Sequence, residues 1–75
     1  MSGVADEPDL EPGVSSEWVS YLQQLLNHHY GQTVVDETGF FDDATASAVA
    51  HFRTQSGLPD GDGVDSQFWD MLLGR

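Results

Sequence analysis

The chain has 75 residues, no cysteine, and 13 acidic residues against two basic ones, which gives a formal net charge of -11 at pH 7. A chain of this length forms at most one small domain, and without disulfides that domain needs an apolar core, which a hydrophobic share of 39% can supply. The charge argues against nucleic acid and anionic membrane surfaces as partners, because both are bound by clustered Lys or Arg. No stretch approaches the ~20 apolar residues of a membrane-spanning helix.

Residues 1–14 differ in composition from the remainder, since they combine four acidic residues with two prolines and two glycines. Their apolar side chains are few, and such a segment buries too little surface to offset the entropy of ordering it. We therefore predict a disordered tail or linker over residues 1–15, with docking of this tail as the alternative, and a folded domain over residues 16–75. The acidic amino terminus also lacks the apolar run of a secretory signal.

Residues 16–30 carry apolar side chains at the three- and four-residue spacing of an amphipathic helix. Ser15 or Ser16 can cap the start of this helix, and Gly31 can end it. Residues 31–41 lack the helical period and contain adjacent valines and a glycine, which favours a loop.

Two further helices are predicted, over residues 42–56 and 65–73, each starting at an acidic or serine cap. The caps are Asp42 or Asp43 for the first and Asp65 or Ser66 for the second. Two Asp-Gly pairs in residues 59–64 indicate turns between them. The fold class is therefore all-α, a small three-helix bundle with long connecting loops. Its predicted core is Leu22, Leu26, Val49, Phe52, Trp69 and Leu72.

The polar residues do not assemble a recognisable catalytic or metal site. His28 and His29 point about 100° apart on one helix, and His51 lies on another, so three converging ligands are not expected. The paired carboxylates are explained by helix capping and solvation, and the Asp-Gly repeat at residues 60–63 lacks the Glu that closes a calcium loop. We therefore predict a non-catalytic chain with no cofactor and no metal.

Gln23 is the most informative polar residue, because it lies beside Leu22 at the inner edge of the first helix. A buried amide needs hydrogen-bonding partners, and the backbone of residues 31–41 can supply them. We favour a structural clamp over a ligand contact for this side chain.

Three motifs, in order along residues 16–73, resemble the peptidoglycan-binding domain 1 family. They are Val19-x-x-Leu22-Gln23-x-x-Leu26, then Gly39-Phe40-Phe41-Asp42-x-x-Thr45-x-x-Ala48-Val49-x-x-Phe52, and finally Gly57-Leu58 with Val64-Asp65-x-x-Phe68-Trp69-x-x-Leu72. The sequence departs from the family at Arg53 and Phe68, where Gln and Thr are usual. Phe41 occupies the family's core position, which leaves Phe40 as the exposed one of the pair.

The resemblance implies a non-catalytic three-helix module that holds a wall-lytic enzyme against peptidoglycan. The expected partners are peptidoglycan or muropeptides and a catalytic domain in cis, the expected state is a monomer, and the expected setting is extracellular or in the cell envelope. The acidic charge opposes attraction to anionic wall polymers. It leaves open the alternative of a protein–protein interaction module, on the same fold, with a basic protein partner.

Binding a wall polymer takes a shallow cleft with an aromatic platform and a few hydrogen-bonding groups. Tyr30, Phe40 and Gln67 are expected near the loop ends and can provide these. Arg53 can pair with a peptide carboxylate, or alternatively with a nearby Asp of the chain itself. Asp62, in the Asp-Gly turn, completes the predicted ligand-binding set.

Overall fold

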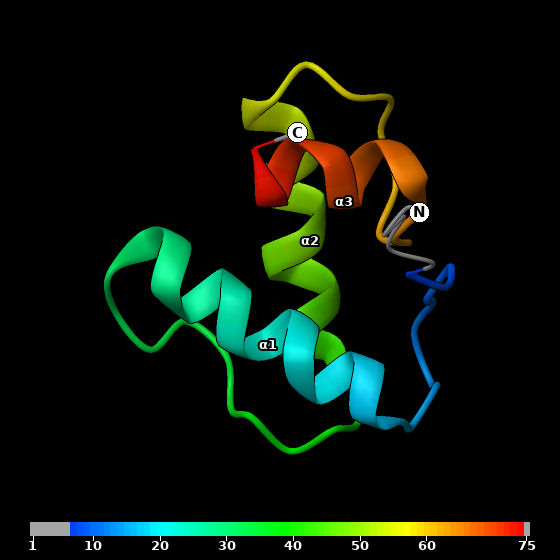
Figure 1. Cartoon of the computed structure of the whole chain (residues 1–75), viewed down its shortest axis with the longest axis vertical. Coiled ribbons are helices and arrows are strands. Elements are labelled where there is room, and N and C mark those ends of the chain that lie inside the picture. The colour runs from blue at the N-terminus through cyan, green and yellow to red at the C-terminus, as the bar shows by residue number, and fades with distance from the viewer. Residues whose placement is uncertain (1–6, 75) are drawn as a thin grey trace, which may run out of the picture.

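Three helices joined by long loops make up residues 7–74, the part of the chain that the computed structural model describes. They are α1 (Glu17–Tyr30), α2 (Asp43–Gln55) and α3 (Ser66–Leu73). In Figure 1, α2 stands upright, with α1 crossing below and α3 above. The all-α, three-helix class expected from the sequence is confirmed. Within the described residues, no helix has the length and apolar character needed to cross a membrane.

Each helix starts at a side chain that caps it. Ser16, Asp42 and Asp65 each accept a hydrogen bond from the backbone N–H three residues further on, at 3.3, 2.9 and 2.9 Å respectively. These bonds satisfy N–H groups that have no partner inside the helix. Gly31 and Gly74 end α1 and α3 with φ of 67° and 76°, a left-handed conformation that glycine adopts without strain.

The core combines inward residues of all three helices with apolar side chains from the loops. Of the expected core residues, five are buried, and Leu72 is only partly buried at the edge of the cluster. Phe68, one turn earlier in α3, is fully buried instead. The core consists of Leu10, Val19, Leu22, Leu26, Val35, Phe41, Val49, Phe52, Val64, Phe68 and Trp69.

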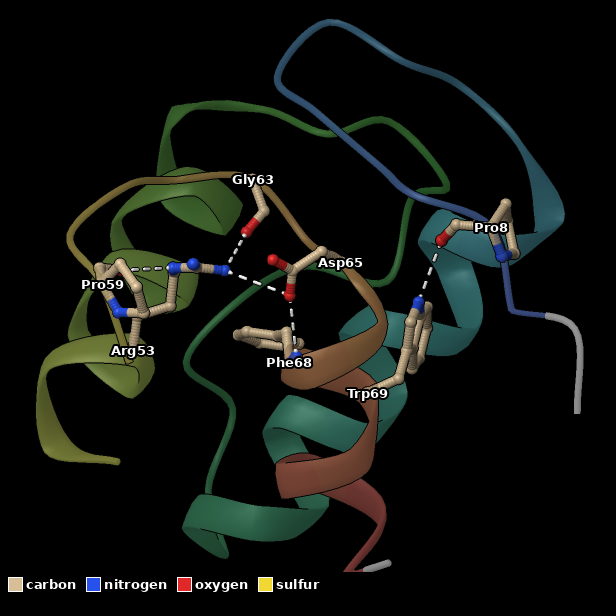
Figure 2. A network of polar contacts seen from close by, with 7 residues as sticks. All are labelled: Pro8, Arg53, Pro59, Gly63, Asp65, Phe68 and Trp69. Atoms are coloured by element: carbon tan, nitrogen blue, oxygen red, sulfur yellow. Dashed lines mark hydrogen bonds and ion pairs between the residues drawn. The ribbon is translucent and has the colours of Figure 1, made fainter. Parts of the chain in front are cut away.

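Residues 8–15 lie against the domain, which corrects the expectation of a disordered tail up to residue 15. Leu10 is 4% exposed, and it forms an antiparallel bridge with Val64 through N–H···O bonds of 2.9 and 2.8 Å. The indole N–H of Trp69 donates to the carbonyl oxygen of Pro8 at 2.9 Å (Figure 2). One buried leucine and these hydrogen bonds order a segment whose other side chains are exposed or only partly buried.

The same segment continues along the loop that enters α2. Phe41 donates its N–H to Val14 at 2.8 Å and accepts one from Gly13 at 3.0 Å, and Ser15 forms a bridge with Phe40. In Figure 1 this blue segment runs down one side of the molecule, from the start of α3 to the start of α1. It therefore joins the entry points of all three helices. Residues 1–6 of the expected tail lie outside the described residues.

Truncation of Leu10 should destabilise the domain strongly, because its side chain fills a place in the core. Leu10→Ala should lower the free energy of unfolding by about 2–5 kcal/mol, the range for buried leucines. Urea unfolding followed by tryptophan fluorescence measures this, with exposed Glu11→Ala as the neighbouring control. Equal stability of the two variants would show that the segment does not dock in solution.

Acid unfolding should depend on Asp42 more than on its neighbour Asp43. Hydrogen bonds from the backbone N–H and then the hydroxyl of Thr45 lower the pKa of Asp42 below its ordinary 3.8. A depressed folded-state pKa adds stability that is present above the unfolded-state pKa and is lost as pH falls through the folded-state value.

Asp42→Asn keeps a capping oxygen without the charge, so it should lose less stability than the parent chain between about pH 5 and pH 2. Asp43→Asn, which changes an exposed carboxylate one residue later, should follow the parent curve. The prediction is contradicted if the two variants show the same pH dependence of unfolding.

Candidate functional site

Two exposed aromatic rings stand on the amino-terminal half of α1. Trp18 and Tyr21 are each 39% exposed, and their ring centroids lie 5.8 Å apart in an edge-to-face arrangement. Both rings rest on Trp69 of α3, with centroid distances of 6.0 Å for Trp18 and 5.9 Å for the stacked Tyr21. Because Trp69 is fully buried and hydrogen-bonded to Pro8, it gives the two outer rings a fixed base.

An open hollow of about 500 Å³ lies beside these rings. It is lined by Trp18 and Tyr21 of α1, by Glu17 in the first turn of the same helix, and by Glu7 of the amino-terminal segment. Trp18 and Tyr21 are three residues apart, so they share one face of α1. We call this feature the aromatic hollow.

A second hollow, of about 430 Å³, shares Glu17 with the first and is rich in hydroxyl groups. We call it the hydroxyl hollow. Gly39 lines it with φ of 81°, and its carbonyl accepts the Ser16 N–H at 3.0 Å. A Cβ at Gly39 would lie 3.4 Å from the Ser16 carbonyl oxygen, a contact that the loop can accept, so it is the positive φ that favours glycine here. The lining residues are Ser15, Ser16, Glu17, Ser20, Thr38 and Gly39.

Gln23 fixes the loop that forms this hollow. Its amide nitrogen donates to the Phe40 carbonyl at 2.9 Å and to the Thr45 hydroxyl at 3.0 Å, and its amide oxygen accepts the Gly39 N–H at 2.9 Å. The side chain is fully buried, so each of these bonds replaces one that water would otherwise make. The expected structural clamp is confirmed.

Phe40 is 46% exposed while Phe41 is 1% exposed, as the sequence indicates. The backbone bridge between Phe40 and Ser15 places residue 40 next to a residue that lines the hydroxyl hollow, although Phe40 itself does not line it. Of the predicted ligand-binding residues, Phe40 is therefore the one beside the α1 hollows.

Tyr30 lies at the other end of α1 and is half-buried. Its hydroxyl donates to the Gln55 side chain at 2.7 Å, and its ring lies 4.8 Å from that of His29 and 6.2 Å from that of His51. Burial raises the pKa of Tyr30 above 10.0. These contacts join the carboxyl-terminal ends of α1 and α2.

Asp62 and Gln67 are both exposed, in the α2–α3 loop and in α3 respectively. The α2–α3 loop lies at the opposite end of the molecule in Figure 1 from the loop that carries Phe40. The structure thus does not gather the five predicted residues on one surface, and ligand contacts at Tyr30, Asp62 and Gln67 stay predictions.

Arg53 is buried rather than displayed, with 7% of its surface exposed. Its Nε donates to the Pro59 carbonyl at 2.8 Å and its terminal nitrogen to the Gly63 carbonyl at 3.0 Å, and the same nitrogen lies 3.6 Å from the Asp65 carboxylate (Figure 2). The expected pairing with a neighbouring Asp is therefore present, between a buried Arg53 side chain and an Asp65 side chain that is 43% exposed, and the Arg53 hydrogen bonds close the α2–α3 loop. The hollow that Arg53 lines also carries Asp9 and Glu11, which disfavour an incoming carboxylate.

The surface of residues 7–74 carries no Lys or Arg side chain, because Arg53 is buried and the only other basic residue is Arg75, outside the described part. All acidic residues except Asp6 lie within it. Among these residues, no three His, Asp or Glu side chains gather closely enough to hold a metal ion.

Sequence reasoning did not identify the aromatic hollow. The spacing of Trp18 and Tyr21 places them on one helix face. Large apolar residues at such a spacing normally indicate side chains at the edge of the core, not a binding surface. Their exposure depends on Trp69, which comes from the far end of the chain and fills the space beneath them. A tryptophan and a tyrosine three residues apart, just after a serine-rich helix start, are the signal that could have pointed here.

Comparison with known proteins identifies the class of domain. Residues 15–72 match the family model described as "Putative peptidoglycan binding domain", and the chain belongs to this family, which confirms the resemblance seen in the sequence. Among solved structures, the crystal structure of the SleB N-terminal domain is similar, with a TM-score of 0.82 and 25% sequence identity over 95% of this chain and 96% of that one. No curated protein sequence matches this chain.

Removal of the Arg53 guanidinium should open the α2–α3 loop. Arg53→Ala leaves the Pro59 and Gly63 carbonyls without their donor, so it should cost about 1–3 kcal/mol of unfolding free energy. Arg53→Lys should recover little, because one ammonium cannot reach both carbonyls in the fork geometry of a guanidinium. Urea unfolding measures both. Full stability in Arg53→Ala would show that this network contributes nothing, and wall binding of the folded variant tests the predicted ligand role.

Proposed function

We propose that this chain is a non-catalytic module that binds peptidoglycan and holds an attached or associated wall-lytic enzyme against the wall. Its family membership supports the ligand class. The observation that carries the proposal is the pair of adjoining hollows on the amino-terminal half of α1, one aromatic and one rich in hydroxyl groups, which share Glu17. The setting that follows is the cell envelope or the extracellular side of it.

The two hollows match the two kinds of surface that a glycan strand presents. A pyranose ring has an apolar face that stacks on aromatic rings, which Trp18, Tyr21 and Phe40 supply with exposures of 39, 39 and 46%. Its hydroxyl and N-acetyl groups exchange hydrogen bonds with serine and threonine side chains, which the hydroxyl hollow supplies. Since both hollows are open and shallow, they suit an extended polymer or a muropeptide chain.

Binding of this kind is weak at a single site and effective through tethering. The negative surface gives no long-range attraction to anionic wall polymers, but at physiological salt its repulsion is screened beyond roughly 8 Å. A linked catalytic domain then gains a raised local concentration of substrate without any new contact. One monomeric module is sufficient for this role.

The second candidate is an interaction module with a basic protein as partner. The observation in its favour is that the surface of residues 7–74 carries no Lys or Arg charge. Such binding relies on charge, so it weakens as salt is raised, whereas contact with the glycan does not.

Retention on insoluble peptidoglycan sacculi tests the function. Trp18→Ala and Phe40→Ala should each reduce retention about two- to tenfold, which corresponds to the loss of one aromatic contact. Met71→Ala removes an equally exposed hydrophobic side chain, 47% exposed on α3, and should leave retention unchanged. Thermal melts of all variants show whether each one is folded.

The salt dependence of the same assay separates the two candidates. Retention that persists when salt is raised well above about 0.15 M supports wall binding. Absence of pelleting at every salt concentration, with capture of a basic protein at low salt, would replace the first proposal by the second.

A further inference from the structure

The hydroxyl hollow contains hydrogen-bonding groups that the chain itself does not use. Ser15 and Ser20 line it, and neither hydroxyl has a hydrogen-bonding partner among residues 7–74. The Ser16 hydroxyl oxygen accepts the Val19 N–H at 3.3 Å, which leaves its own O–H available as a donor. A serine hydroxyl donates one hydrogen bond and accepts others. The hollow therefore offers a ligand several donors and acceptors, all of them uncharged.

The walls of this hollow are fixed by hydrogen bonds within the chain. The Ser16 N–H donates to the Gly39 carbonyl at 3.0 Å, and the buried Gln23 amide oxygen accepts the Gly39 N–H at 2.9 Å. The Thr38 hydroxyl accepts the Phe40 N–H at 3.2 Å. Because helix and loop are already joined, little ordering is needed when a ligand binds. The volume of about 430 Å³ lies within the range of small-ligand sites.

The charge that the described residues place in the hollow is negative. Glu17 is the one charged residue among those that line it, and its exposed carboxylate has no ion pair or hydrogen bond with residues 7–74. The start of α1 adds roughly half a positive charge nearby, which the full charge of the carboxylate exceeds. A ligand carboxylate entering this space meets a like charge, whereas hydroxyl and amide groups meet no such repulsion.

We propose that the hydroxyl hollow binds neutral N-acetylated sugar units and that Glu17 makes it select against sugars that carry a carboxylate. This inference rests on the proposed function and assigns the glycan, not the peptide, to this hollow. The hydroxyl and acetamido groups of the sugar exchange hydrogen bonds with Ser15, Ser16 and Ser20. Since none of these contacts involves a peptide, the chain also binds peptide-free chains of β-1,4-linked N-acetylglucosamine.

The test compares two disaccharides that differ by one charge. The first is N-acetylglucosaminyl-N-acetylmuramic acid with a free lactyl carboxylate, and the second carries a primary amide in place of that carboxylate. Two-dimensional NMR of the ¹⁵N-labelled chain measures both affinities at about 0.01 M ionic strength, where charges act over roughly 30 Å. The backbone amides of Ser20 and Thr38 are the reporters, and that of Gly57, after the end of α2, is the internal reference.

We expect the amide to bind about threefold more tightly than the acid, which is the size of one exposed charge–charge contact. The tetramer of β-1,4-linked N-acetylglucosamine should shift the same two reporter signals. Equal affinities of the parent chain for the acid and the amide would overturn the inference.

Glu17→Gln should bring the two affinities to within about 1.5-fold of each other, because it removes the repelling charge. Asp60→Asn is the matched control, since it removes the same charge from an exposed position in the α2–α3 loop that does not line the hollow. It should keep the threefold preference. Equal effects of the two variants would show that net charge, and not the hollow, sets the preference, which contradicts the inference.

Ser20→Ala tests the hydroxyl contact separately from the charge. It should weaken binding of both disaccharides about two- to fivefold and leave their ratio unchanged, because one neutral hydrogen bond is lost. Ser47→Ala changes an exposed serine of α2 outside the hollow and should alter neither affinity. Thermal melts show whether both variants are folded. Unchanged affinity in folded Ser20→Ala would place the sugar elsewhere and overturn the assignment.

Retention on sacculi separates failure of this inference from failure of the proposed function. Retention of the parent chain without binding of the N-acetylglucosamine tetramer would reject this inference alone. Binding of the tetramer at the reporter amides, with selection against the carboxylate but without retention on sacculi, would support this inference and reject wall binding.

Discussion

Trp69 is the side chain on which the arrangement of this small domain depends. It is fully buried in the core, its indole N–H holds the amino-terminal segment through Pro8, and its ring supports Trp18 and Tyr21 from below. A domain of this size has room for few such residues, because a small domain buries a smaller share of its chain's surface than a large one does. One indole therefore serves both the stability of the fold and the geometry of the candidate site.

Side chains of the helices hold the loops by hydrogen bonds to loop backbone, which allows a three-helix domain to present a defined surface. Gln23 secures the loop entering α2, and Asn27 secures the preceding stretch by accepting the N–H groups of Val34 and Val35 at 2.8 and 3.0 Å. Arg53 does the same for the loop entering α3. Each loop thus depends on a polar side chain of the preceding helix, whose position that helix fixes. Little further ordering is then needed when a ligand binds, so little affinity is lost to it.

Much of the fold could be predicted because its determinants are local. The helix spans follow from apolar periodicity and from the capping residues Ser16, Asp42 and Asp65, each of which acts within three residues. Gln23 was recognisable because an amide at an inner helix edge needs partners. The docking of Leu10 against Val64 was not predictable from the sequence. The two bridging N–H groups belong to the backbone, which every residue shares, so the sequence carries no signal for the bridge. The aromatic hollow was missed for a related reason, because it forms only where α1 meets Trp69.

The position of Asp65 couples two features that are separate in the sequence. Its carboxylate starts α3 by accepting the Phe68 N–H at 2.9 Å, and it also faces the Arg53 guanidinium at 3.6 Å. Loss of either side chain changes how much the other contributes to the free energy of unfolding. The energetic effects of substitutions at Arg53 and Asp65 will therefore not add. Epistasis of this kind means that a change at one of the pair can be harmless or harmful depending on which residue already occupies the other.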